Sequence, residues 1–224
     1  MAHLKRLTVP KSWSIKKKET VFIAVPMPGP HKKNEAMTLN LILKDFLKVA
    51  KTTREVKKIL YEKKVLVDDI PRKDYRFPVG VMDIITVPSM NESYILLFSE
   101  KGKFILKKLA VNPKEKSCKI IGKHILPKKK VQINLYDGKN LLVDKDAYKV
   151  GDTVVVSEGK IKRHLKLEKG ALVYLIGGKH IGATGKLTDI KKFKGIENDR
   201  IIMETKEGTI ETLKDYAFVI EKVS

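Results

Sequence analysis

The stretch TLNLILKDFLKVAKTTREVKKILYEKKVLVDD, residues 38–69, decides how the first half of the chain folds. Its apolar residues recur at three- and four-residue spacing, which predicts a first helix over residues 37–51 with Thr38 as its N-cap. Thr52 and Glu55 match a capping box, which predicts that a second helix begins directly afterwards. The expected core positions of the two helices are Leu39, Leu43, Phe46, Val56, Ile59 and Leu60.

Short strands follow the two helices. Val65–Val67 and Ile84–Val87 are rich in β-branched residues, and Asp68–Asp69 is typical of a turn. Two helices and two strands within about 50 residues predict a small α+β unit. We place this two-helix module at residues 37–90.

From residue 91 onward the pattern is that of β structure. YILLF (94–98) and FILKKL (104–109) flank SEKGK, which predicts a hairpin with Gly102 at its turn. Further short strands continue to the C-terminus and favour small barrels over a parallel sheet. The predicted fold class is α+β and mostly β, with a central β domain at 91–170 and a barrel at 171–224.

Residues 1–36 are expected to form an extended basic arm. Four prolines between residues 10 and 30 rule out a continuous helix. Lys16–Lys18 and His31–Lys33 are basic clusters, so the arm is either a flexible tail or becomes ordered against a charged partner. Trp13, the only tryptophan, fits two roles: stacking on a nucleotide, or packing the arm onto its own body.

The net charge separates the possible classes of function. The 224 residues include 47 Lys and Arg against 26 Asp and Glu, a formal net charge of +21. A compact body with this much like charge repels itself, so a polyanionic partner is expected. Basic residues occur in every section of the chain, which disfavours a neutral enzyme with one basic tail.

A membrane or secreted protein has less support. No apolar run approaches the roughly 18–20 residues needed to span a bilayer, and the opening MAHLKRLTVPKSW lacks the apolar stretch of a secretory signal. The single cysteine, Cys118, excludes an internal disulfide and fits a reducing cytoplasm.

The loop GGKHIGATGKLTDI, residues 177–190, has four glycines beside basic side chains but does not match a phosphate loop. The Walker pattern requires a glycine at the position of His180 and a hydroxyl residue at that of Leu187. The glycines Gly178, Gly182 and Gly185 are instead expected in a turn between strands, where they permit positive φ and close approach.

Neither a metal site nor a catalytic site is indicated. The five histidines are scattered, and none lies at ligand spacing from Cys118 or from another histidine. No nucleophile and base stand out as a pair. We therefore expect no enzyme activity, no metal and no cofactor.

Four stretches, in this order along the chain, resemble one known family. HLKRLTVPKSW (3–13) and PGPHKKNEAMTLNLIL (28–43) are similar to the family's start and to its entry into the first helix. REVKKIL, VLVDD and VGVMDIITV, within residues 54–87, resemble an RNA-binding module, and GGKHIGATGKLTDI resembles a KOW motif. The chain thus resembles the archaeal and eukaryotic small-subunit ribosomal protein four family, which is distinct from its bacterial namesake.

The resemblance implies a structural component of the small ribosomal subunit, on the ribosome in the cytoplasm, with an SH3-like KOW barrel at 171–224. Its implied partners are small-subunit rRNA and neighbouring small-subunit ribosomal proteins, and self-association is not expected. Two alternatives stay open: an RNA-modifying enzyme that holds its substrate with the two-helix module, and a KOW-type transcription elongation factor.

The side chains that the resemblance and the charge pattern together assign to RNA are basic, with one aromatic. In the arm they are Lys5, Arg6, Lys11, Trp13, Lys16, Lys17, Lys18, His31, Lys32 and Lys33. In the two-helix module they are Lys44, Lys48, Lys51, Arg54, Lys57, Lys58, Arg72 and Lys73. In the glycine loop they are Lys179, His180 and Lys186.

Overall fold

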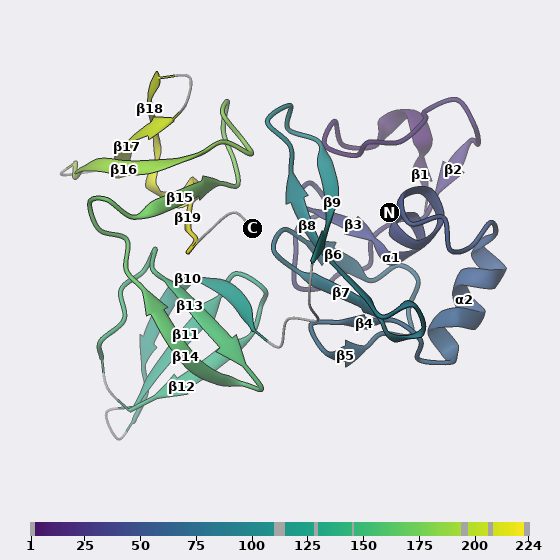
Figure 1. Cartoon of the computed structure of the whole chain (residues 1–224), viewed down its shortest axis with the longest axis horizontal. Coiled ribbons are helices and arrows are strands. Elements are labelled where there is room, and N and C mark those ends of the chain that lie inside the picture. The colour runs from purple at the N-terminus through teal and green to yellow at the C-terminus, as the bar shows by residue number, and fades with distance from the viewer. Residues whose placement is uncertain are drawn as a thin grey trace. The chain divides into compact units, whose positions relative to one another are not determined.

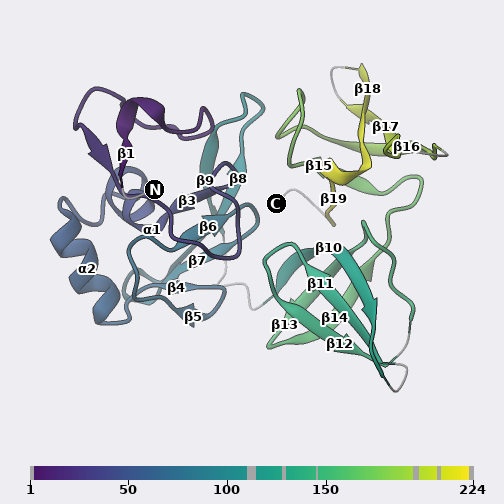
Figure 2. The same ribbon diagram turned by 180° about the vertical axis from the view of Figure 1, so that it is seen from behind.

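The computed structural model, drawn from two sides in Figures 1 and 2, describes residues 3–109, 115–127, 130–144, 146–193, 197–205 and 208–221. The chain divides into two compact units. The first consists of Met1–Phe98 and Lys103–Lys116, and the second of Ser99–Gly102 and Ser117–Ser224.

The first unit is built around a five-stranded antiparallel sheet in the order β5-β4-β7-β8-β9. The strands are β4 (Leu66–Val67), β5 (Ile70–Pro71), β7 (Ile84–Val87), β8 (Glu92–Phe98) and β9 (Phe104–Leu109). A short 3-10 helix, η3 (Pro88–Met90), joins β7 to β8. Because β7 and β8 are paired, the domain boundary expected after residue 90 falls inside this sheet.

The two expected turns lie in this sheet. Asp68 and Asp69 connect β4 to β5 with φ of 52° and 63°, a left-handed conformation that aspartate tolerates better than most residues. Gly102, with φ of 68°, lies in the connection from β8 to β9. The predicted turn and hairpin are both present.

The first predicted helix is shorter than expected. α1 (Leu39–Leu41) continues directly into a π-helical turn, η2 (Ile42–Phe46), and the chain then reverses at Lys48, whose φ is 55°. The prediction that this helix extends to residue 51 is therefore wrong. Ala50 is buried all the same, so the apolar spacing continued past the point where the helix ends.

The second helix, α2 (Thr53–Tyr61), begins at the predicted capping box. Glu55 donates its backbone N–H to the Thr52 hydroxyl (3.3 Å), and its carboxylate accepts the Lys51 N–H (2.8 Å). Thr38 occupies the N-cap of α1 but makes no side-chain cap bond. Of the expected core positions, Leu39, Leu43, Val56 and Leu60 are fully buried, and Phe46 and Ile59 are partly buried.

The arm packs onto the rest of the first unit. Its strands β1 (Leu4–Lys5) and β2 (Phe22–Ile23) pair with each other around the short 3-10 helix η1 (Arg6–Thr8), and β3 (Ala36–Thr38) pairs with β6 (Pro78–Gly80). Trp13 is 2% exposed and donates its indole N–H to the Ala36 carbonyl at 3.0 Å. Of the two roles open to Trp13, it fills the packing role.

The second unit contains two five-stranded sheets. The first has the order β12-β11-β10-β13-β14 and packs around Cys118, Ile120, Ile133, Leu135 and Val154. Its strands are β10 (Lys116–Ile125), β11 (Val131–Leu135), β12 (Asn140–Val143), β13 (Thr153–Ser157) and β14 (Lys160–Leu165).

The other sheet is antiparallel, with the order β18-β17-β16-β15-β19. Its elements are β15 (Leu172–Leu175), β16 (Thr184–Lys191), β17 (Arg200–Thr205), β18 (Gly208–Leu213), the 3-10 helix η5 (Lys214–Tyr216) and β19 (Ala217–Val219). Both sheets form barrel-like domains, as predicted, and the fold class is confirmed as mostly β.

The glycine loop holds its three predicted glycines for two different reasons. Gly178 and Gly182 each have φ of 84°, which a side chain would strain. Gly185 lies in β16 rather than in a turn, which corrects that part of the prediction. A Cβ on Gly185 would lie 2.3 Å from the Glu204 carbonyl oxygen, so glycine is needed there for close approach to β17.

Gly185→Ala should destabilise the sheet of β15–β19 by about 1–3 kcal/mol, because the backbone of β17 must move to admit the methyl group. Hydrogen exchange of β16 and β17 peptides measures this loss. Gly122→Ala in β10 is the matched control, since its Cβ would meet no atom closer than 3.4 Å. Equal protection in both variants would contradict the close-approach explanation.

Candidate nucleic-acid interface

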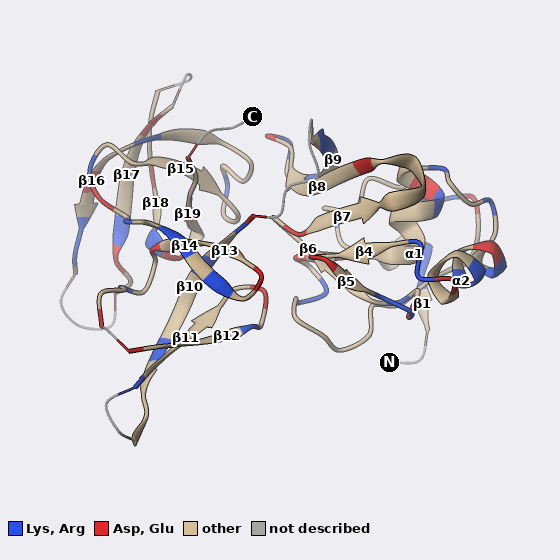
Figure 3. Cartoon of the chain, turned by 60° about the horizontal axis from the view of Figure 1, so that its bottom comes forward, with Lys and Arg blue, Asp and Glu red and all other residues tan. Residues whose placement is uncertain are grey.

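The predicted basic rim lies on the outer side of α2. Lys51, Arg54, Lys57 and Lys58 are all exposed, while Val56 and Leu60 on the opposite side are fully buried. Figure 3 shows blue Lys and Arg segments on α2, with red acidic segments beside them. The helix therefore presents a cationic face to solvent because its other face is fixed in the core.

The turn η2, the bend that follows it and the loop after β5 carry further predicted contacts. Lys48 and Lys73 are exposed, and Lys44 and Arg72 are partly buried. The Arg72 guanidinium lies 4.3 Å from the centre of the Phe77 ring, and the Lys57 ammonium lies 4.7 Å from that of Tyr75. Such cation–π contacts hold a long side chain in place without neutralising its charge.

The predicted RNA contacts of the arm that are exposed are all lysines. Lys16–Lys18 form one exposed loop, and Lys32 and Lys33 follow at the other end of the arm. The other exposed predicted contacts in the arm are Lys5 and Lys11. Because the arm is folded onto the first unit, these lysines are held on a fixed surface.

The structure corrects the prediction for Arg6, Trp13 and His31, which are buried and bonded within the chain. The Arg6 guanidinium donates to the Lys16 carbonyl (2.6 Å) and the Thr20 hydroxyl (3.0 Å). It also reaches the carboxylates of Glu19 (3.2 Å) and Asp45 (3.4 Å). Charge alone could not separate these inward-facing groups from their exposed neighbours.

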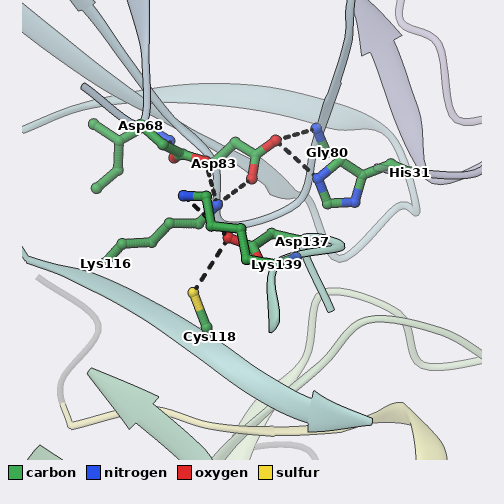
Figure 4. A network of polar contacts seen from close by, with 9 residues as sticks. His31, Asp68, Gly80, Asp83, Lys116, Cys118, Asp137 and Lys139 are labelled. Atoms are coloured by element: carbon green, nitrogen blue, oxygen red, sulfur yellow. Dashed lines mark hydrogen bonds and ion pairs between the residues drawn. The ribbon is translucent and has the colours of Figure 1, made fainter. Parts of the chain in front are cut away.

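His31 belongs to a buried polar cluster of the first unit, drawn in Figure 4. Its Nε2–H donates to Asp83 Oδ2 at 2.9 Å, and the Gly80 N–H donates to the same oxygen at 2.7 Å. The Lys116 ammonium bridges Asp83 (2.6 Å) and Asp68 (2.5 Å). Sequence reasoning took Asp68 as a turn residue only, since its partners lie far away in the chain.

The two carboxylates of this cluster titrate differently. Burial alone would raise the pKa of Asp83, but Lys116 and His31 outweigh burial and hold that pKa well below its ordinary value. Burial and repulsion from Asp83 raise the pKa of Asp68, despite Lys116. Asp83 thus keeps its charge to lower pH than Asp68 does.

Two of the three predicted basic contacts in the glycine loop are exposed to solvent. Lys179 and Lys186 are exposed, and His180 is partly buried. Sequence reasoning missed a further basic strand, β14, where Lys160, Lys162 and Arg163 are exposed. The density of basic residues in KIKRHLK was the signal that would have found it.

Comparisons with known proteins identify the family. The chain matches the model described as Ribosomal family S4e over residues 90–161 and the RS4NT (NUC023) domain over residues 2–34. It is 39% identical to the small ribosomal subunit protein eS4 of Methanococcus vannielii, over 97% of this chain and 93% of that protein. The chain belongs to the ribosomal protein S4e family.

Other S4e proteins agree with this assignment. The small ribosomal subunit protein eS4 of Methanocella arvoryzae is 42% identical, over 99% of this chain and 95% of that protein. The crystal structure of the 30S ribosomal protein S4e from Thermoplasma acidophilum is 31% identical and superposes with a TM-score of 0.71. That match covers 85% of this chain and 97% of the other. The resemblance stated from the sequence is therefore confirmed at the level of the S4e family.

No helix in the described ranges is long and apolar enough to span a membrane.

Asp83→Asn should lower the unfolding free energy of the first unit by about 3–5 kcal/mol at neutral pH, because it leaves Lys116 and His31 without their shared carboxylate. Since the pKa of Asp83 is lowered on folding, its stabilisation is present above about pH 4 and lost as pH falls further. The difference from the wild type should therefore shrink on acidification.

Fluorescence of Trp13, the single tryptophan, reports unfolding of this unit in denaturant titrations at several pH values. Asp74→Asn is the control, since Asp74 pairs with Arg76 at the surface (3.9 Å). A difference between Asp83→Asn and wild type that stays constant with pH would contradict a lowered pKa of Asp83 in the folded chain.

Proposed function

We propose that this chain binds small-subunit rRNA through the exposed basic face of α2, the adjoining loops and the lysines of the arm. Membership of the S4e family makes it a structural component of the small ribosomal subunit, located on the ribosome in the cytoplasm, and not an enzyme. Neither alternative, the RNA-modifying enzyme or the elongation factor, has support from the relatives. The observation that carries the proposal is the cationic outer face of α2, whose orientation is fixed by the fully buried Val56 and Leu60 on the opposite face.

Electrostatics supplies the affinity in this mechanism. Each Lys or Arg that neutralises a phosphate releases a condensed counterion, so binding weakens steeply as salt rises. The side chains on the face of α2 are flexible and read no base sequence by themselves. Placement then comes from the shape of the folded rRNA against the rigid first unit.

The finer organisation remains part of the proposal. We assign residues 1–36 as the arm and 171–224 as a KOW-type SH3-like barrel. For the two parts between them, expected at 37–90 and 91–170, we move the boundary from residue 90 to the end of β9, because β7 pairs with β8 and β8 with β9. Neighbouring small-subunit ribosomal proteins are the proposed protein partners, with no self-association.

Affinity of the wild-type chain for small-subunit rRNA should fall about a thousandfold between about 50 and 200 mM salt, as expected for about six phosphate contacts. Replacing Lys51 and Lys58 by alanine should lower the slope of log affinity against log salt by about two. Lys169→Ala is the control, because Lys169 already pairs with Asp189 at 2.8 Å. A wild-type affinity that does not change with salt would rule out the electrostatic mechanism.

The glycine loop has a separate test. If Lys179 and Lys186 touch rRNA, replacing both by alanine should reduce incorporation into small subunits, measured by sedimentation of tagged protein. Lys191→Ala, on the same sheet but paired with Glu211 at 3.2 Å, should incorporate normally. Normal incorporation of the double variant would instead identify the loop as a purely structural turn.

A further inference from the structure

Tyr61 is an exposed aromatic side chain on the basic face of α2. It lies at the C-terminal end of α2 and is 78% exposed, more than any other large hydrophobic residue in the described part of the chain. The rings of Tyr75 and Phe77, between β5 and β6, are partly buried and lie under Lys57 and Arg72 respectively. Among the described residues, the ring of Tyr61 therefore differs from those of Tyr75 and Phe77, because it packs neither in the core nor under a cation.

Helix geometry aligns Tyr61 with the cationic face. Tyr61 follows Arg54 by seven residues, which places the two side chains only about 20° apart around the axis. Lys57 and Lys58 lie on either side of this line, one helical turn before Tyr61. The buried positions Val56 and Leu60 fix this orientation from the other side.

The acidic side chains in and around α2 bond to groups of the same segment. Residues 51–64 contain six Lys or Arg and two Glu. Glu55 is held by the helix N-terminus, and Glu62 pairs with Lys64 at 2.5 Å. The surroundings of Tyr61 therefore remain cationic, which favours a polyanion over a protein surface as the group that covers the ring.

We propose that Tyr61 is a stacking platform for an unpaired nucleobase of the rRNA, with Arg54, Lys57 and Lys58 holding the flanking phosphates. Aromatic rings beside cations are the usual means of holding single-stranded RNA, because every base offers a π face. This inference rests on the proposed function and adds to it a structural class of target: a single-stranded segment rather than a duplex.

The test uses the full chain and a single-stranded RNA oligonucleotide carrying 2-aminopurine, whose fluorescence is quenched when the base stacks. Tyr61→Ala and Tyr61→Leu should each weaken binding about tenfold and abolish the protein-dependent quenching, while Tyr61→Phe should retain both. The salt slope should stay unchanged in all three, since no phosphate contact is removed.

Lys58→Ala is the matched control from the same face: it should lower the salt slope and keep the quenching. Trp13 fluorescence checks that every variant is folded.

The stacking role would be overturned if Tyr61→Ala bound RNA with wild-type affinity, or if Tyr61→Leu and Tyr61→Phe bound RNA with equal affinity. Normal RNA binding by Tyr61→Ala with poor subunit incorporation would overturn it in favour of a protein contact. Failure of the wild-type chain to bind any RNA would instead overturn the proposed function.

Discussion

The carboxylate of Asp83 is the group on which the first unit depends. It is 2% exposed and accepts bonds from His31 in the arm, Gly80 in β6 and Lys116 at the start of β10. A buried charge is tolerated only when it is paired and hydrogen-bonded, so all three donors must be in place. Gly80 meets a second requirement, because a Cβ there would lie 2.4 Å from the His31 ring. One polar cluster thus joins segments that are distant in the sequence.

This cluster, together with Trp13 and Arg6, orders the arm and therefore the exposed lysines that it carries. A free arm would lose conformational entropy when it became ordered on RNA, and that loss would weaken binding. Here the arm is ordered by contacts within the chain, and its exposed lysines lie on a folded surface. The same internal contacts that bury Arg6 and His31 hold Lys16–Lys18 and Lys32 in position on the proposed RNA-binding surface.

Several local signals in the sequence predicted the structure correctly, whereas contacts between distant segments could not be predicted. The Thr52–Glu55 capping box, the Asp68–Asp69 turn and the strand Ile84–Val87 depend on neighbouring residues, and each is present in the structure. The burial of Arg6 and the double role of Asp68 depend on partners up to 48 residues away. A single sequence shows which residue types are present, but it does not show which residues contact each other in the fold.

The charge of the chain illustrates the same limit in physical terms. The formal net charge of +21 counts every cation equally, yet Arg6, Lys116 and Lys119 are buried. Burial lowers the pKa of Lys119 to about 8, and its ammonium donates to the Asp215 carbonyl at 2.6 Å. These buried cations hold segments of the fold together, so they add little to the electrostatic potential at the surface.

A polyanion is attracted by a local excess of positive charge, which is largest where the acidic side chains are already paired. The outer face of α2 meets that condition, because Glu55 is held by the helix N-terminus and Glu62 by Lys64.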